Sequence, residues 1–130
     1  MSTKFAAIDI GLKRIGTAIC LQKDIVTPYP AILRKNRNQA ARDVMSFLDE
    51  WEIDTLVVGY PTSSEDMMKR VNHFVTLLDF KGPIEFQNEN MSSIEAQELM
   101  KGDIKYKRDG RVDSIAAKII LERYLNRPKK

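Results

Sequence analysis

The first third of the chain alternates between short apolar runs and turn residues, a pattern typical of β-strands. In FAAIDI, residues 5–10, both faces are apolar apart from Asp9, which predicts a central strand covered on both sides. IGTAICL follows a glycine-containing turn, and QKD joins it as a hairpin to DIVTPYPAIL. Pro28 and Pro30 predict that this third strand lies at an edge of the sheet.

From residue 36 onward the pattern changes to helices alternating with strands. Asn36 and Gln39 resemble a capping box that starts a helix. A second helix is predicted over residues 66–80, and TLVVGY and PIEFQNE are predicted strands. The apolar stripes of the two helices consist of Val44, Phe47, Leu48 and Trp51 in the first and of Met67, Met68, Val71, Phe74, Val75 and Leu78 in the second.

Two more helices are predicted near the carboxyl terminus. Ser92 and Glu95 form an S-x-x-E capping box for a helix that runs to about Lys101. RVDSIAAKIILERYLN forms the last helix, which Pro128 ends. The element order predicts an α/β fold in one domain, residues 1–130, with a five-stranded mixed sheet flanked by helices.

Composition narrows the protein class without defining a function. The 130 residues are 43% hydrophobic and 30% charged, as in ordinary globular domains, and the net charge of +3 permits a polyanionic partner. Cys20 is the single cysteine, so a disulfide framework is excluded, and its apolar surroundings predict a buried side chain. No apolar run approaches the length of a membrane helix, and no signal peptide is evident, so we expect a cytoplasmic protein.

Three carboxylates are expected to converge in this fold. Asp9 lies near the end of the first strand and Glu89 just past the end of the last one, where functional groups of α/β sheets gather. Asp113 shares a helix face with three small or apolar residues, which predicts that it points toward the sheet. Those residues are Ala116, Ala117 and Ile120.

Each acid also has a simpler interpretation when it is taken alone. Asp9 could accept hydrogen bonds from the backbone of the turn before Gly11, Glu89 could be a solvated loop residue, and Asp113 could be favoured by the helix dipole. The metal-site hypothesis therefore rests on all three acids together.

An all-oxygen ligand set of this kind suits Mg²⁺ or Mn²⁺. Two such ions can activate a water and stabilise the leaving oxygen in phosphodiester cleavage, so that no histidine base is needed. The single histidine, His73, lies on a predicted helix without a metal-ligand partner at helical spacing, and we interpret it as a surface or packing residue.

Four segments of the chain together resemble a known family. DIGLKRIG, VVGYP, the NENMSS segment and VDSIAAKIIL, in this order and spacing, resemble the YqgF family of bacterial proteins. The family is also called RuvX and comprises Holliday-junction resolvases and pre-16S rRNA processing nucleases. The resemblance implies a ribonuclease H-like fold and maps the family's metal-binding acids onto Asp9, Glu89 and Asp113.

The chain departs from the family pattern in one segment. Where the family has D-E-R-x-T-T, this chain has Asn88, Glu89, Asn90, Met91, Ser92 and Ser93. The acid Glu89 is kept, and the two serines keep hydroxyl groups that can cap a helix. Asn90 replaces an arginine that could hold a phosphate with two hydrogen bonds, so we expect a weaker grip on the substrate or slower turnover.

Cations close to the proposed acid site are candidates for contacts with substrate phosphates. Lys13 and Arg14 lie in the turn after Asp9. A second group precedes Asp113 and includes Tyr106, which could stack on a base, although a solvated loop is the alternative interpretation. Its cations are Lys101, Lys105, Lys107, Arg108 and Arg111, of which Lys107, Arg108 and Arg111 are the chief candidates.

The favoured hypothesis is a metal-dependent nuclease that acts on RNA, by resemblance at the 5′ end of pre-16S rRNA in ribosomal precursor particles. A resolvase of branched DNA would use the same chemistry, and phosphate contacts do not distinguish the two substrates. A nucleic-acid-binding protein without cleavage activity is the alternative from another class. An ATP-binding module of the actin kind is disfavoured. Such proteins enclose the nucleotide between two related domains, and a chain of 130 residues has room for only one of them.

Overall fold

The computed structural model describes residues 3–22, 25–88 and 111–126, with the side chains of 111–113 excepted. Its strands are β1 (Phe5–Ile10), β2 (Arg14–Gln22), β3 (Ile25–Leu33), β4 (Thr55–Tyr60) and β5 (Ile84–Asn88). Its helices are α1 (Arg37–Glu50), α2 (Glu65–Thr76) and α5 (Arg111–Asn126). The predicted helix over residues 92–101 lies outside the described residues.

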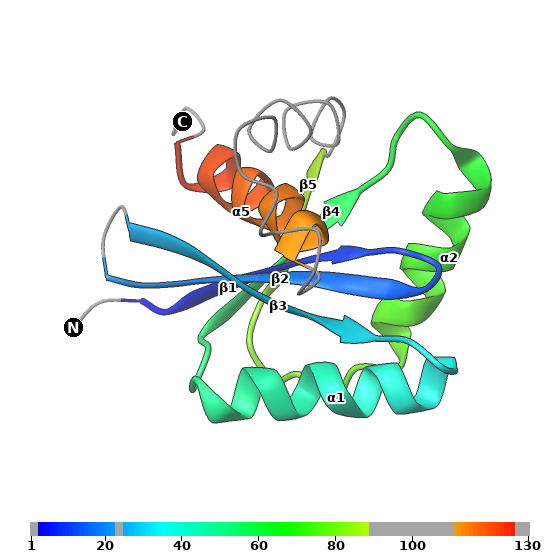
Figure 1. Ribbon diagram of the computed structural model, residues 1–130, viewed down its shortest axis with the longest axis horizontal. Helices are drawn as coiled ribbons and strands as arrows, with labels where there is room; N and C mark the ends of the chain where they lie inside the picture. The colour runs from blue at the N-terminus through cyan, green and yellow to red at the C-terminus, as the bar shows by residue number, and fades with distance from the viewer. Residues whose placement is uncertain (1–2, 23–24, 89–110, 127–130) are drawn as a thin grey trace.

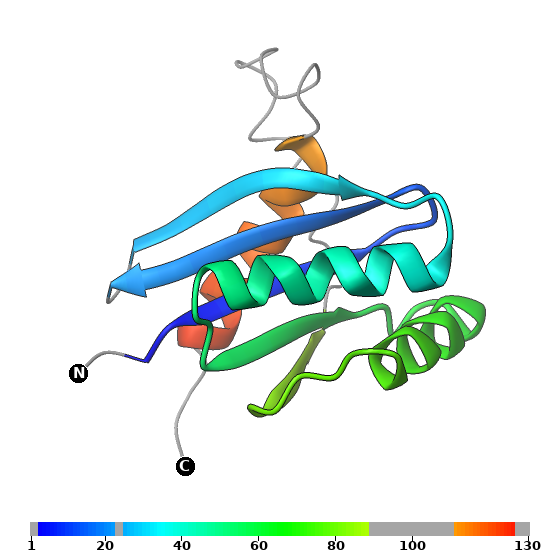
Figure 2. The same ribbon diagram turned by 90° about the horizontal axis from the view of Figure 1, so that it is seen from below.

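The five strands form one mixed sheet in the order β3-β2-β1-β4-β5. Strand β1 is antiparallel to β2 and parallel to β4, and β5 is parallel to β4. Helices α1 and α2 lie against one face of the sheet and α5 crosses the other (Figures 1 and 2). The prediction of a five-stranded mixed α/β sheet, with the proline-containing strand at an edge, is confirmed.

Alternation along the strands divides the buried side chains between two cores. On the face covered by α1 and α2, the strands contribute Ala6, Ile8, Ile10, Ile15, Ile19, Leu56 and Val58. On the face covered by α5, they contribute Ala7, Ala18, Cys20 and Val57, which pack against Ala117, Ile120 and Leu121. Cys20 is buried, as its apolar surroundings predict.

Helix α1 begins and ends with specific backbone contacts. The predicted capping box is present, because the Asn36 side chain accepts a hydrogen bond from the N–H of Gln39 and the Gln39 side chain accepts one from the N–H of Asn36. At the other end, Ile53 N–H donates to Leu48 O over 3.0 Å, and Glu52 lies between them with a φ of 51°. This is the geometry that glycine usually provides at a helix end.

Helix α2 is shorter than the prediction of residues 66–80. It begins one residue earlier, at Glu65, where Ser64 caps it by accepting a hydrogen bond from the N–H of Met67. It ends at Thr76 because the N–H groups of Leu77 and Leu78 bond to carbonyls only three residues back, which tightens the final turn. The apolar stripe continues past this end, since Leu78 is still buried.

Helix α5 is attached to the sheet through Ser114, which is fully buried. The Ser114 hydroxyl donates to the carbonyl of Tyr29 on β3 and accepts from the N–H of Thr17 on β2 over 3.2 Å. Thr17 and Tyr29 face each other across these two strands, next to a β-bulge where the register shifts. The serine thus takes the place of a backbone hydrogen bond and fixes the first turn of α5 on the sheet.

The turn between β1 and β2 is equally constrained. Gly11 N–H donates to Arg14 O over 2.9 Å, and a Cβ at residue 11 would lie 2.7 Å from that same carbonyl oxygen. Arg34 holds the turn from the other side, because its Nη1 donates to the Gly11 carbonyl over 2.9 Å. Only a residue without a side chain fits this close approach.

We expect Ser114→Ala to lower the free energy of unfolding by about 1–3 kcal/mol, since it leaves the buried N–H of Thr17 without its acceptor. Urea denaturation followed by circular dichroism measures this change. Ser46→Ala, at an exposed position of α1, is the matched control and should leave the stability within about 0.5 kcal/mol of the wild type. Equal stabilities of the two variants would contradict the bridging role of Ser114.

We expect Gly11→Ala to destabilise the fold by about 1–3 kcal/mol, because the added methyl group displaces the Arg14 carbonyl. Lys13→Ala, in the same turn but exposed, should have little effect. The midpoint of thermal unfolding compares the two variants. A Gly11→Ala protein as stable as the wild type would show that the turn relaxes without cost.

Candidate active site

Asp9 lies on the α5 face of the sheet, at the carboxyl end of β1. It follows Ala7 by two residues and so points to the same face, and its side chain is half-buried. The residue opposite Asp9 on β2 is Gly16. On β4, Ile8 pairs with Val58, so the next residue, Gly59, lies at the level of Asp9.

Glycines therefore flank Asp9 on both neighbouring strands. Neither Gly16 nor Gly59 places a side chain on the α5 face beside the carboxylate. At this level the two strands present only backbone, and the acid is the functional group that the sheet offers to the first turn of α5. Glycine at both positions keeps the neighbouring strands from placing a Cβ where a ligand of the carboxylate would lie.

The end of β5 reaches the same edge of the sheet. Tyr60 on β4 pairs with Asn88, the last residue of β5, one residue beyond the level of Asp9. Glu85 pairs with Val57 and so lies on the α5 face, as does Gln87 two residues later. Glu89 lies outside the described residues, but the strand that leads to it ends two strands away from Asp9, which corresponds to about 10 Å.

The first turn of α5 lies over the same part of the sheet. Asp113 is a backbone member of this turn, and its side chain is outside the described part of the structure. The next residue, Ser114, bonds to Thr17, whose neighbour Gly16 is the residue opposite Asp9. The apolar face predicted for this helix is confirmed, because Ala116, Ala117 and Ile120 are all buried.

The predicted cations are described only in part. Lys13 and Arg14 are exposed in the turn that follows Asp9. Lys107 and Arg108 lie outside the described residues, and Arg111 begins α5 with a side chain that is not described. The residues that sequence reasoning missed are Gly59 and Ser114. The signal available for Gly59 was its position in VVGY, at the end of a strand.

The described side chains include no cluster of three or more metal-ligating groups. Of the three acids, Asp9 is the one whose side chain belongs to that part. Its oxygen donors, its partial burial and the two flanking glycines fit a hard divalent cation, which requires oxygen ligands and room for water or phosphate.

In the described part of the chain, no helix has the length and apolar character needed to span a bilayer.

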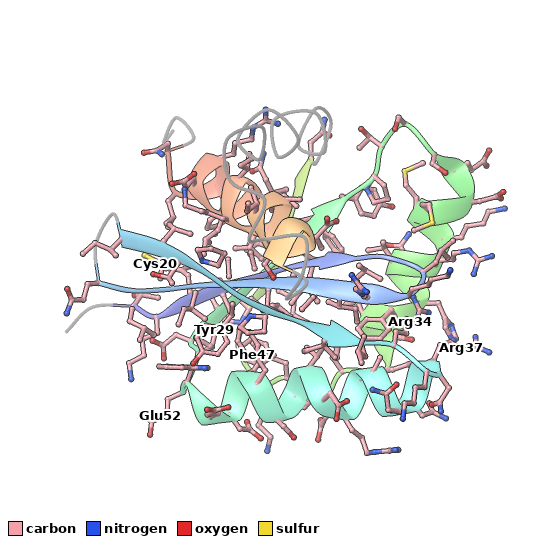
Figure 3. All side chains as sticks on the ribbon, viewed as in Figure 1. Cys20, Tyr29, Arg34, Arg37, Phe47 and Glu52 are labelled. Atoms are coloured by element: carbon pink, nitrogen blue, oxygen red, sulfur yellow. The ribbon has the colours of Figure 1, made fainter. Side chains whose placement is uncertain are left out.

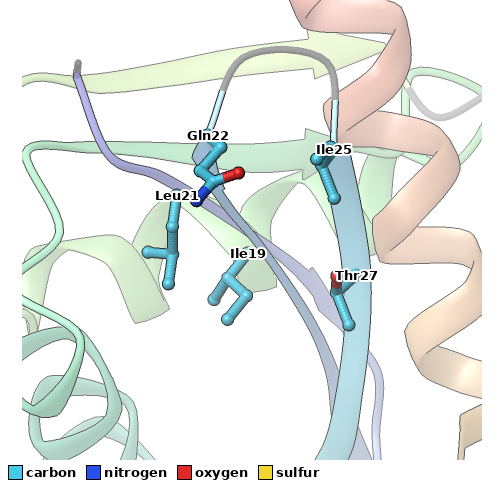
Figure 4. Close-up of a pocket in the computed structure, with 5 residues that line it drawn as sticks. All are labelled: Ile19, Leu21, Gln22, Ile25 and Thr27. Atoms are coloured by element: carbon cyan, nitrogen blue, oxygen red, sulfur yellow. The ribbon is translucent and has the colours of Figure 1, made fainter.

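A hollow at the other end of the sheet is separate from this site. It has a volume of about 200 Å³ and is lined by Ile19, Leu21, Gln22, Ile25 and Thr27 around the β2–β3 hairpin (Figure 4). Phe5, the first residue of β1, pairs with Cys20 near this end, whereas Asp9 lies toward the opposite end of the strand. Its lining carries no charged group, so it contributes nothing to the acid site.

Comparisons with known proteins identify the fold and the family of this chain. In solved structures, the chain resembles the fowlpox virus resolvase in complex with its substrate Holliday junction DNA, with a TM-score of 0.58 at 14% identity over 95% of this chain and 97% of that one. The viral resolvase without DNA gives a TM-score of 0.57. At this identity the likeness establishes the fold, which is ribonuclease H-like.

Relatives of known name are much closer in sequence. A protein of Sulfurovum sp. named "Putative pre-16S rRNA nuclease" is 62% identical over 95% of this chain and 98% of its own length. Proteins of the same name from Sulfurimonas denitrificans and Helicobacter pylori are 58% and 51% identical, over 94% and 91% of this chain and 96% and 92% of their own lengths. The family model described as RuvX, Holliday junction resolvase, matches residues 3–127. The chain therefore belongs to the RuvX family.

Proposed function

We propose that this protein is a metal-dependent nuclease that processes the 5′ end of pre-16S rRNA. Membership of a nuclease family makes it a hydrolase of phosphodiester bonds. The observation that supports the location of its active site is the position of Asp9. This carboxylate lies between two glycines, on the face of the sheet to which Ser114 fixes the first turn of α5.

Asp9, Glu89 and Asp113 are the proposed metal ligands and catalytic residues. Asp9 is the central ligand, Glu89 follows from the end of β5, and Asp113 enters from the first turn of α5. When bound there, Mg²⁺ or Mn²⁺ supplies the Lewis acid that activates a water and stabilises the leaving oxygen. In this proposal the protein's own contribution is to bring the three carboxylates together at one end of the sheet.

Substrate phosphates are held by cations on both sides of these acids in the proposed arrangement. Lys13 and Arg14 are exposed on the turn that follows Asp9, where the hydrogen bonds of Gly11 keep the backbone in place. Lys107, Arg108 and Arg111 precede Asp113 in the chain. Because Asn90 stands where the family pattern D-E-R-x-T-T has an arginine, we expect these cations to supply more of the phosphate binding.

RNA is the favoured substrate because relatives that are 62% and 58% identical to this chain carry the name of an rRNA nuclease. Branched DNA is the second candidate, supported by the description of the family and by the DNA complex of the viral resolvase. A location in the cytoplasm, with binding to ribosomal precursor particles, belongs to the RNA proposal. A binding protein without cleavage activity would need the acid site to be inactive.

Cleavage assays separate these possibilities. Purified protein is incubated with a labelled pre-16S RNA, a Holliday junction and an unstructured RNA, with Mg²⁺, with Mn²⁺ or with a chelator. We expect cleavage of the precursor RNA that requires a divalent ion. Faster cleavage of the junction would favour the resolvase, and tight binding with no cleavage of any substrate would contradict the nuclease proposal.

We expect Asp9→Asn to abolish cleavage and to leave the stability of the metal-free protein unchanged or higher. Three carboxylates held close together repel one another, and removal of one charge relieves that repulsion. Asp49→Asn, exposed near the end of α1, is the matched control and should cleave at the wild-type rate. Chemical denaturation and initial cleavage rates, measured on the same preparations, test both expectations.

Two outcomes would contradict the assignment of Asp9. A variant that unfolds would show that Asp9 is structural. Residual cleavage equal to that of the wild type would show that the measured activity comes from a contaminant.

A further inference from the structure

A second polar feature lies on the other side of the β1–β2 turn, away from α5. It is a pocket of about 410 Å³ whose lining is basic throughout: Arg34, Arg37, Lys69, Arg70 and His73. Arg34 follows β3, Arg37 begins α1, and the other three residues come from α2. Arg34 and Arg37 lie at the end of the molecule where the start of α1 faces α2 (Figure 3).

The cations of this basic pocket have no direct ion-pair partner within the described part of the protein: none of these five residues forms an ion pair with a carboxylate there. Partial burial, and then the nearby Arg70 and Arg37, lower the pKa of the Arg34 guanidinium. The contributions of Arg70 and Arg37 show that like charges lie close to Arg34, and such a concentration of positive charge attracts anions.

The basic pocket and the acid site share a structural element. Arg34 stacks on the Phe74 ring, with its guanidinium carbon 5.6 Å from the ring centre, and donates to the carbonyl of Gly11, two residues after Asp9. Its own N–H donates to the carbonyl of Lys13 over 2.9 Å. Lys13 and Arg14 on this turn therefore lie between the acid on one face of the sheet and the pocket cations on the other.

We propose that the basic pocket binds a backbone phosphate of the nucleic acid whose scissile bond lies at Asp9, so that the strand passes over the Gly11–Arg14 turn. The inference rests on the proposed nuclease function and extends it to a second contact region. The pocket is open to a nucleic-acid strand that continues beyond it on both sides, because four of its lining residues are exposed. They are Arg37, Lys69, Arg70 and His73. An arginine guanidinium can donate two parallel hydrogen bonds to two oxygens of one phosphate, and such contacts give affinity without sequence preference.

The test compares a pocket variant with a matched control across RNA length. Arg37→Gln combined with Lys69→Gln removes two exposed charges from the pocket, and Arg42→Gln combined with Lys81→Gln removes two exposed charges elsewhere. Arg34 is kept, because it supports the turn. Affinity is measured by fluorescence anisotropy for single-stranded RNAs of increasing length, at several salt concentrations and with Ca²⁺ in place of Mg²⁺.

For long RNAs we expect the pocket variant to bind about tenfold more weakly than the control variant. The slope of its log affinity against log salt concentration should be smaller by about one, which corresponds to the loss of one phosphate contact. For the shortest RNAs, which reach only the acid site, the two variants should bind alike. Equal affinities of the two variants at every length would overturn the proposal.

The ring of His73 provides a direct readout, since it is the single histidine of the sequence. Its NMR signals should shift when long RNA is added and should not shift with the shortest RNA. Inorganic phosphate and a mononucleotide are titrated in parallel. A saturable shift with either small anion, and none with long RNA, would overturn the assignment to nucleic acid and indicate a site for a free phosphate.

Failure of this inference is distinguishable from failure of the proposed function. Asp9→Asn should lose cleavage but keep the length-dependent affinity and the His73 shift, whereas the pocket variant should keep cleavage of short RNA. If the wild type cleaves RNA but the pocket and control variants bind RNA equally well at every length, the second contact region alone is overturned. Length-dependent binding without cleavage by the wild type overturns the nuclease and leaves the phosphate site.

Discussion

The position of α5 on the sheet depends on the buried hydroxyl of Ser114, which joins Thr17 of β2 to Tyr29 of β3 where their own ladder is interrupted by a bulge. A hydroxyl both donates and accepts, so it can replace the missing backbone hydrogen bond on both strands. This contact fixes the level at which the helix begins. That level is one residue away from the pair formed by Gly16 and Asp9.

The fold places the acidic side chain of Asp9 and the basic pocket on opposite sides of the turn between β1 and β2. The α5 face carries Asp9, and the opposite side carries the basic pocket around Arg34. The turn itself is rigid because Gly11 and Arg14 bond to each other and Arg34 bonds to the Gly11 carbonyl. A polyanion that follows this turn would meet positive charge on its way to the acids, which is a favourable arrangement for steering a nucleic acid.

Local rules predicted most of the fold from the sequence. Alternation identified the strands, prolines identified the edge strand, and Asn36 with Gln39 identified the start of α1. The period of two also places Asp9 on the same face of the sheet as Ala7, but it does not say which helix covers that face. Sequence could not predict the bridge made by Ser114 or the basic pocket, because both join residues that are far apart in the chain. Arg34 and Arg37 meet Lys69 and Arg70 only through the packing of α1 and α2.

The clustered cations around Arg34 also carry an energetic cost for the folded protein. Burial of the Arg34 guanidinium, and then its proximity to Arg70 and Arg37, disfavour its charged form in the folded protein, and both effects are largely absent from the extended chain. The fold therefore gives up part of its stability to keep positive charge concentrated beside the turn. An anion that binds there returns part of this free energy, so the protein should resist unfolding most strongly when it is engaged with its polyanionic ligand.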